Sequence, residues 1–371
     1  MPNPNAIVGR IVATDPSVEK LNGADFFRRY PNGVSIGFEA GVVARLFPGE
    51  RSAGMLEILE QLRQMALPVY VEVNPATRAI TRLLIPLITR VLNITSAALS
   101  GAPPAQPDYS VELEASHARH TLKGGNPDFA NLLELLRAAL SAKRSLMVTE
   151  TDDHEIIDVR AAPPDTATPP GPGPEPLKTR ESWFHRFCRR WFCFFCCVSG
   201  QRATQLFALC AAPSCNPLTV PAPCIPFLYP DDGCWARAHE MCRLMIAAGA
   251  RPSKVWIDGS LHTLTRNNPN CFVNWGWHVA PTICVRRRFF SSELMVIDPS
   301  LFTTPVTEAT WKSVQGDPNA TLTNTAATVY WRNVIPTDPN YVDTNIRLQF
   351  YRLQLKNRSL AFGPPPYANC P

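Results

Sequence analysis

The sequence contains no hydrophobic run long enough to cross a membrane. The longest unbroken apolar run in its 371 residues is the eight residues 191–198, whereas a transmembrane helix needs about 20. The apolar stretch 83–94 is interrupted by Arg90. Charge is also sparse, at 18% of residues against 45% hydrophobic, which is too little charge for a disordered chain. The composition therefore predicts a globular protein with hydrophobic cores and no membrane span.

The first residues, MPNPNAIVGR, lack the basic stretch and apolar core of a secretory signal. A cytosolic protein, a signal that has been removed and another export route all fit this absence. The sequence start therefore leaves the location open.

Cysteine and tryptophan are missing from the first part of the chain, since all twelve Cys and all eight Trp lie beyond residue 182. Residues 1–160 carry a net charge of −2, whereas residues 161–371 carry +7. Such a change in composition is typical of two separate folding units.

A proline-rich segment marks the border between these two parts. Residues 161–178 contain seven prolines, and proline at that density favours an extended polyproline II chain over a packed core. We therefore expect an N-terminal accessory domain at 1–160, a linker at 161–180 and a second domain at 181–371.

The N-terminal domain shows signs of an internal duplication. Three pairs of segments resemble each other at offsets of 75 to 77 residues. The pairs are 34–40 with 109–115, 55–62 with 132–139, and 69–73 with 146–150. Apolar spacing in each copy predicts a strand, an amphipathic helix and then a hairpin, which gives an α+β domain with a tandem repeat.

Nothing in the first 160 residues indicates catalysis. His117, His120 and His154 are interpreted as ordinary polar residues rather than metal ligands. The reason is that no cysteine or paired acidic cluster accompanies them in the sequence.

The first residue with clear catalytic potential is Cys234. It precedes a run with helical apolar spacing that ends at Gly249, with Pro252 following. Asp231 or Asp232 is predicted to cap the helix with its carboxylate. Cys234 would then lie at a helix N-terminus, where free N–H groups stabilise both a thiolate and an oxyanion. The alternative is a small buried core cysteine.

Residues 271–285 and 293–298 are predicted to form an antiparallel hairpin. The first run contains His278 and the second ends at Asp298, before Pro299. A turn centred on residue 288 makes His278 and Asp298 direct cross-strand partners, within reach of an imidazole–carboxylate hydrogen bond. The alternative for His278 is a satisfied core histidine.

These residues lie in motifs that resemble the protein-glutamine glutaminase (protein deamidase) family over roughly residues 200–350. The motifs are DGCWARAHEM, WGWHVAP, VIDPSLF, NTAATVYWR and DTNIRLQF, in this order. The resemblance implies an α+β fold like that of papain and transglutaminases, with an antiparallel sheet and the nucleophile at a helix N-terminus. It also implies a catalytic triad of Cys234, His278 and Asp298.

The activity implied by the resemblance is hydrolysis of a protein-bound glutamine side chain to glutamate and ammonia through a cysteine thioester. No metal or organic cofactor is required. Trp235, Trp275 and Trp277 are candidates for a substrate channel, because flat aromatic faces suit an aliphatic chain that ends in an amide; packing in the core is the alternative. Partners are expected to be proteins with accessible glutamines, and no nucleic-acid-binding module is recognised.

Several alternatives remain open. The same triad suits a cysteine protease or a transglutaminase-type acyl transferase, and a non-catalytic effector or binding module is a further class. Family members carry an upstream pro-region that blocks the cleft, and residues 1–160 occupy that place without matching a motif. Contact of this region with the catalytic domain, delivery and partner binding are all open roles. The family resemblance also favours secretion.

Other cysteines offer two further hypotheses. Cys193, Cys196 and Cys197 are dense enough for a zinc site, but they lack a second matching pair, so a metal is not expected there. Cys215 and Cys224 would close a small loop by a disulfide in an oxidising compartment.

Overall fold

The computed structural model describes residues 3–18, 23–96, 106–163, 197–287, 291–331 and 338–371. The chain divides into two compact units, one of residues 1–169 with 356–364 and the other of residues 170–355 with 365–371. The predicted proline-rich linker lies outside the described residues from residue 164 onward. None of the described helices combines the length and apolarity that a membrane crossing requires.

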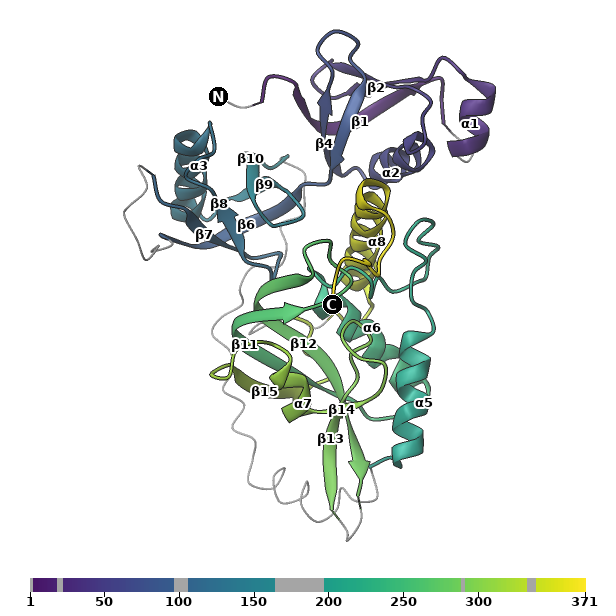
Figure 1. The fold of residues 1–371 in the computed structure, drawn as a ribbon, viewed down its shortest axis with the longest axis vertical. Helices are drawn as coiled ribbons and strands as arrows, with labels where there is room; N and C mark the ends of the chain where they lie inside the picture. Colours follow the sequence, from purple (N-terminus) through teal and green to yellow (C-terminus); the bar gives the residue numbers. More distant parts are fainter. Residues whose placement is uncertain (1–2, 19–22, 97–105, 164–196, 288–290, 332–337) are drawn as a thin grey trace. The chain divides into compact units, whose positions relative to one another are not determined.

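The first unit begins with a five-stranded antiparallel sheet in the order β3-β2-β1-β4-β5 (Figure 1). Its helices are α1 (Gly23–Arg29) and α2 (Ser52–Gln64). Apolar side chains that alternate along the strands, such as Val34, Ile36 and Phe38, are buried. The strands are β1 (Ala6–Asp15), β2 (Val34–Phe38), β3 (Val43–Leu46), β4 (Pro68–Val73) and β5 (Ile80–Leu84).

A second five-stranded sheet in the same unit has the order β10-β9-β6-β7-β8. Read from the other edge, this is the order of the first sheet with each strand number raised by five. A helix, α3 (Phe129–Ala142), again separates the third and fourth strands of the set. The strands are β6 (Leu87–Ser96), β7 (Tyr109–Leu113), β8 (His120–Leu122), β9 (Ser145–Glu150) and β10 (Ile156–Ala161).

Both sheets are closed by the same kind of contact between an edge strand and the opposite hairpin. In the first sheet, the Arg45 N–H donates to the Arg78 carbonyl at 2.9 Å, and in the second sheet the Thr121 N–H donates to the His154 carbonyl at 2.9 Å. Arg78 and His154 both adopt a left-handed backbone, with φ of 60° and 57°. The two sheets therefore share their strand order and the conformation of the closing turn.

The second unit is built on one antiparallel sheet in the order β14-β13-β12-β11-β15. Its strands are β11 (Ser253–Leu264), β12 (Phe272–Arg286), β13 (Ser292–Val296), β14 (Val306–Thr307) and β15 (Thr321–Ala326). Helix α6 (Cys234–Ala247) packs on β12, and α5 (Gly200–Ala211) packs beside α6 (Figure 1). A core of Val255, Ile257, Trp275, Val296 and Trp311 fills the sheet face. The chain is thus a mixed α and β protein with antiparallel sheets.

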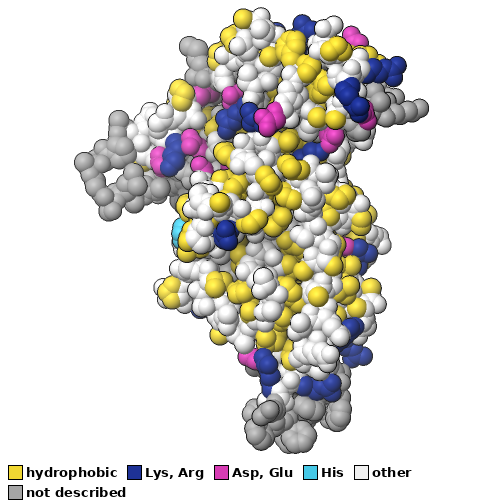
Figure 2. Space-filling model, turned by 45° about the vertical axis from the view of Figure 1, so that its right-hand side comes forward, with side chains coloured by type: hydrophobic (Ala, Val, Ile, Leu, Met, Phe, Trp, Pro, Cys, Tyr) yellow, Lys and Arg dark blue, Asp and Glu magenta, His cyan; other side chains and the backbone are white. Residues whose placement is uncertain are grey.

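The second unit also contains α7 (Glu308–Ser313) and most of α8 (Val342–Phe362). The residues of α8 from 356 onward belong to the first unit. On the face shown in Figure 2, hydrophobic side chains are widely spread, and charged side chains of both signs lie between them in small groups. This mixture agrees with the low overall content of charge.

The predicted β12–β13 hairpin is present, but its register differs from the expected one. Thr282 pairs with Val296, and β13 ends there, so Asp298 lies beyond the ladder. Continued along both strands, this register would place Asp298 opposite Ala280 rather than opposite His278. Residues two apart on a strand lie on the same face. The shift therefore leaves His278 and Asp298 as diagonal neighbours on one face.

Among the described residues of the second unit there are three disulfides, Cys197–Cys284, Cys215–Cys224 and Cys271–Cys370. The predicted Cys215–Cys224 pair is therefore confirmed. Cys193 and Cys196 lie outside the described residues. Among the described cysteines, Cys210, Cys234 and Cys242 are free thiols, and all three are buried.

Candidate functional site

The site begins at the first residue of α6. Gly233 precedes Cys234 with φ of 81°, a left-handed conformation that L side chains rarely adopt. A Cβ at Gly233 would lie 2.3 Å from Cδ2 of Tyr351. Gly233 is therefore required both for its backbone angle and for the close approach of α8.

The predicted carboxylate cap of α6 was wrong. Gly233 is the N-cap and makes no side-chain cap bond. The Asp232 carboxylate accepts from the Gly233 N–H at 2.8 Å, and the Asp231 carboxylate accepts from the Asn268 side chain at 2.5 Å. These two hydrogen bonds hold the loop before the helix, and neither of them goes to an N–H group in the first turn of α6.

Arg237 holds this loop from inside the helix. Its side chain is only 2% exposed and donates to the carbonyl groups of Tyr229 and Asp232, at 2.9 and 2.5 Å. A buried guanidinium that is bonded to backbone carbonyls fixes the path of the chain into Cys234. Sequence reasoning missed this role, because nothing in the GCWARAH motif distinguishes a buried arginine from an exposed one.

His278 and Asp298 are brought together as expected. His278 Nε2 and Asp298 Oδ2 are 2.9 Å apart, and both side chains are buried. The indole N–H of Trp311 donates to the same oxygen at 2.9 Å, and the Ser300 backbone N–H donates to Oδ1 at 3.2 Å. Sequence reasoning did not assign Trp311 this contact, since α7 reaches Asp298 only through the fold.

Cys234 lies next to this pair. Its Sγ atom and a ring nitrogen of His278 lie within 4.8 Å of each other. Because Nε2 bonds Asp298, Nδ1 is the nitrogen on the other edge of the ring. The three residues predicted from the sequence thus lie in one place, drawn from α6, β12 and the loop after β13.

The surroundings of the site raise the pKa of Cys234 and lower the pKa of Asp298. Burial raises the pKa of the Cys234 thiol, and it outweighs the nearby Arg237 and the Val279 backbone hydrogen bond, which lower that pKa. Burial also tends to raise the pKa of Asp298. The His278 ring and the bonds from His278 and Trp311 nevertheless hold the pKa of Asp298 below its usual value. Asp298 is therefore a carboxylate at neutral pH, while the thiol needs a base to lose its proton.

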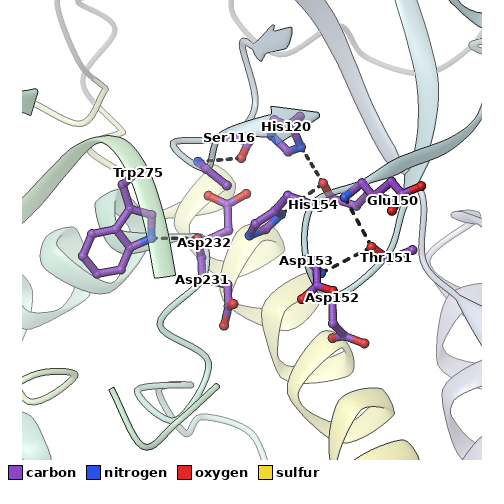
Figure 3. A network of polar contacts seen from close by, with 12 residues as sticks. Ser116, His120, Glu150, Thr151, Asp152, Asp153, His154, Asp231, Asp232 and Trp275 are labelled. Carbon is purple, nitrogen blue, oxygen red and sulfur yellow. Dashed lines mark hydrogen bonds and ion pairs between the residues drawn. The ribbon is translucent and has the colours of Figure 1, made fainter. Parts of the chain in front are cut away.

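Two tryptophan rings, Trp275 and Trp311, stack against His278. Trp275 stacks on His278 with ring centroids 4.4 Å apart, and its indole N–H donates to the Asp231 carbonyl at 3.0 Å (Figure 3). The ring centroids of Trp235 and Trp277 are 6.0 Å apart, and both rings contact the ring of Trp331. Trp275 thus belongs to the support of the imidazole, whereas Trp235 and Trp277 form an aromatic cluster beside the start of α6.

A second polar cluster lies in the first unit. His120, Glu150 and His154 offer three atoms within 4.8 Å of one another that could hold a metal ion. Two of the three histidines that were interpreted as ordinary polar residues thus have an acidic companion, Glu150, which the sequence reasoning did not find. Glu150 is 30 positions from His120 in the sequence, and no spacing pattern connects them.

Comparisons with known proteins agree with the motifs. Residues 203–315, which include Cys234, His278 and Asp298, match a family model described as glutaminase. A protein-glutaminase crystal structure is 32% identical, covering 43% of this chain and 90% of its own, with a TM-score of 0.39. The NMR structure of protein-glutaminase from Chryseobacterium proteolyticum is also 32% identical, covering 47% and 97%, with a TM-score of 0.40.

A crystal structure of pro-protein-glutaminase is 23% identical, covering 76% of this chain and 99% of its own, with a TM-score of 0.48. A search of curated proteins found no match. The 32% identity extends over nearly the whole length of two protein-glutaminases, and the glutaminase model matches the segment that holds the three site residues. This chain belongs to the protein-glutaminase family.

Proposed function

We propose that residues 181–371 form a cysteine-dependent protein-glutamine glutaminase, which hydrolyses the side-chain amide of protein-bound glutamine to glutamate and ammonia. Membership of the family points to a hydrolytic deamidase. The observation that carries the mechanism is the His278–Asp298 bond of 2.9 Å with the Cys234 sulfur within 4.8 Å of the same ring. A nucleophile, a base and an orienting acid in this arrangement suit acyl transfer.

In the first half of the reaction, His278 Nδ1 takes the thiol proton and Cys234 Sγ attacks the side-chain carbonyl carbon of glutamine. The sulfur–carbon bond forms as the carbonyl becomes an oxyanion. The imidazolium then gives its proton to the amide nitrogen, which leaves as ammonia. A γ-glutamyl thioester remains on Cys234.

In the second half, His278 removes a proton from water, and the resulting hydroxide attacks the thioester carbon. The carbon–sulfur bond breaks, and the proton returns to the sulfur. The products are glutamate and the free thiol, so the substrate gains one negative charge. No step requires a metal or an organic cofactor.

The N-terminus of α6 supports the two oxyanions. The first N–H groups of a helix have no partner within the helix, and the helix dipole favours negative charge at that end. In the proposed mechanism the backbone N–H of Cys234 donates to the oxyanion. The pKa of the thiol is raised by burial, so proton removal by His278 accompanies the attack.

Asp298 holds the imidazole in the tautomer that leaves Nδ1 available to the thiol. Its charge stabilises the imidazolium that forms in each half-reaction. Trp235 and Trp277 are proposed as walls for the aliphatic part of the glutamine side chain, and Trp275 as the support of the His278 ring. Flat aromatic surfaces suit both tasks.

We also propose that residues 1–160 are a separate accessory domain that arose by tandem duplication. The shared strand order, the helix after the third strand and the shared left-handed residue of the closing turn support this origin. The three disulfides support the expectation of a secreted protein, because disulfides persist in oxidising compartments.

The test is intact-mass analysis of a glutamine-rich protein after treatment, together with an ammonia assay. The full chain should release ammonia and raise the substrate mass by about 1 Da per event, since an amide becomes an acid. Cys234→Ala should abolish both signals. Cys242→Ala, which removes another buried free thiol from the same helix, should retain them.

Two results would contradict the proposal. Ammonia release by Cys234→Ala would exclude the thioester route. Peptide fragments or cross-linked products in place of the mass increase would assign the site to a protease or to a transglutaminase-type acyl transferase.

A further inference from the structure

The first unit contains a buried group of two imidazoles and one carboxylate. His120 Nδ1 lies 2.5 Å from Glu150 Oε2, and His154 Nδ1 lies 3.1 Å from the same oxygen (Figure 3). The His120 side chain is fully buried, and those of Glu150 and His154 are 10% and 8% exposed. Three donor atoms from β8, β9 and the turn before β10 thus converge on one point.

The backbone that carries these residues is firmly held. The Thr121 N–H, next to His120, donates to the His154 carbonyl at 2.9 Å. Within the turn, Thr151 N–H donates to the Glu155 carbonyl at 2.9 Å, and His154 N–H donates to the Thr151 carbonyl at 3.0 Å. The three side chains are therefore preorganised by the main chain before anything binds.

The carboxylate of this group is shared by the two rings. Glu150 Oε2 is the contact of both Nδ1 atoms, and a buried carboxylate needs a compensating partner. A divalent cation between the three side chains would be such a partner, since imidazole nitrogens and carboxylate oxygens are both metal ligands.

A further observation concerns His120 alone. Its Nε2 atom is buried, and no hydrogen-bond partner for it is found among the described residues. A buried polar atom without a partner is costly. An unsatisfied buried atom in a native structure calls for an explanation, and an ion or a water that belongs to the group is one such explanation.

We propose that His120, Glu150 and His154 bind a zinc ion. Two imidazole nitrogens and one carboxylate oxygen are a common zinc ligand set, with bonds of about 2.0–2.2 Å. Tetrahedral ligands at such bond lengths lie about 3.3 Å apart. The 3.1 Å contact nearly meets this spacing, and the 2.5 Å contact has to open by roughly 0.8 Å, a small side-chain rotation of Glu150.

The first sheet provides an internal comparison. The closing hydrogen bond joins Arg45 to Arg78 in the first sheet and Thr121 to His154 in the second. Arg45 therefore corresponds to Thr121, and Arg78 corresponds to His154. The positions that correspond to His120 and His154 are then Ala44 and Arg78, and the last residue of β4, Val73, corresponds to Glu150 at the end of β9. The first sheet closes in the same way without this ligand set. The fold itself therefore does not require the two histidines and the glutamate, which is why a ligand explains them better than closure of the sheet does.

In this site the zinc ion ties edge strand β8 to the β9–β10 hairpin and completes the closure of the second sheet. This role is independent of the proposed amide hydrolysis, because the ligands all belong to the first unit. The zinc site and the glutaminase site can therefore be tested separately.

The experiment uses the full chain without a histidine tag and with Cys234→Ser, so that the thiol next to His278 cannot bind the metal. Equilibrium dialysis against zinc, followed by metal analysis, should give one zinc per chain. His120→Asn and Glu150→Gln should each weaken zinc binding by at least about 10- to 100-fold, the loss that even outer-sphere changes produce. His262→Asn, at an exposed histidine of β11, should leave it unchanged.

Cobalt substitution gives a second readout that does not depend on folding of the variants. Cobalt bound to the unsubstituted cluster should show a tetrahedral visible spectrum without a thiolate charge-transfer band. Absence of zinc binding, a thiolate band, or binding that the two cluster variants and His262→Asn retain equally would each overturn the proposal.

Discussion

Trp311 and His278 bond the same oxygen of Asp298, each at 2.9 Å. The indole N–H thereby stabilises the charge of the carboxylate that orients the imidazole, and it contributes to the lowered pKa of Asp298. Trp311 comes from the short helix α7, which has no other proposed part in the reaction. The proposed triad therefore depends on a fourth residue that positions its acid.

Trp311→Phe should lower kcat by roughly 10- to 100-fold with little change in KM, because a hydrogen bond to a charged group contributes about 1.5–3 kcal/mol. Loss of the indole N–H also raises the pKa of Asp298 toward its usual value. The acidic limb of the pH–rate profile should therefore move to higher pH. Trp256→Phe, which loses the 2.8 Å bond from Trp256 to Thr325 instead, should leave that limb in place. Equal shifts in both variants would refute a positioning role for Trp311.

Gly233→Ala should destabilise the protein and remove activity together. The new Cβ would lie 2.3 Å from Tyr351 and would occupy a left-handed backbone position, so we expect a loss of about 3 kcal/mol or more. Gly249→Ala is the matched control, since Gly249 has φ of 77° but open space around a Cβ. Its cost should be only about 1 kcal/mol. Urea unfolding measures both values, and similar values would show that the Tyr351 contact is unimportant.

The disulfides should differ in their contribution to stability. In the chain-entropy account, the contribution of a disulfide grows with the length of the loop that it closes. Replacing Cys271 and Cys370, which are 99 residues apart, by Ser should cost about 4–5 kcal/mol. Replacing Cys215 and Cys224, 9 residues apart, should cost about 2–3 kcal/mol. Chemical denaturation of the two double variants tests the order, which a reversed ranking would contradict.

Lys254 should make stability depend on pH above neutrality. It is buried and contacts His239 Nδ1 at 3.1 Å, and burial lowers its pKa to about 8. The unfolded chain, with an ordinary lysine pKa of about 10.4, binds more protons than the folded chain between these two values. The free energy of unfolding should therefore rise by about 2 kcal/mol between pH 8 and 9.5.

This rise should be missing in Lys254→Met and present in Lys312→Met, which changes a lysine on α7. Unfolding of the three proteins at several pH values provides the measurement. An identical pH dependence in wild type and Lys254→Met would mean that Lys254 titrates normally.

Several elements could be predicted from local patterns alone. Helix spacing after Cys234 and alternating apolar residues around His278 located α6, β12 and β13 to within a few residues. The three pairs of similar segments in residues 1–160 predicted two similar sets of strands with a helix, and the two sheets share their strand order. These signals are local because amphipathic periodicity reflects which side of one element is buried.

Local patterns were enough to predict the helix that begins at Cys234, the strand that carries His278, the acid that follows the next strand and the family to which these motifs belong. Three features came to light only in the folded chain: Gly233 caps the helix, β12 and β13 pair in a shifted register, and Trp311 supports Asp298. The fold also brings His120 to Glu150. Such contacts join residues far apart in the chain, and they depend on packing and on the pairing of whole strands, for which no short stretch of sequence carries a pattern.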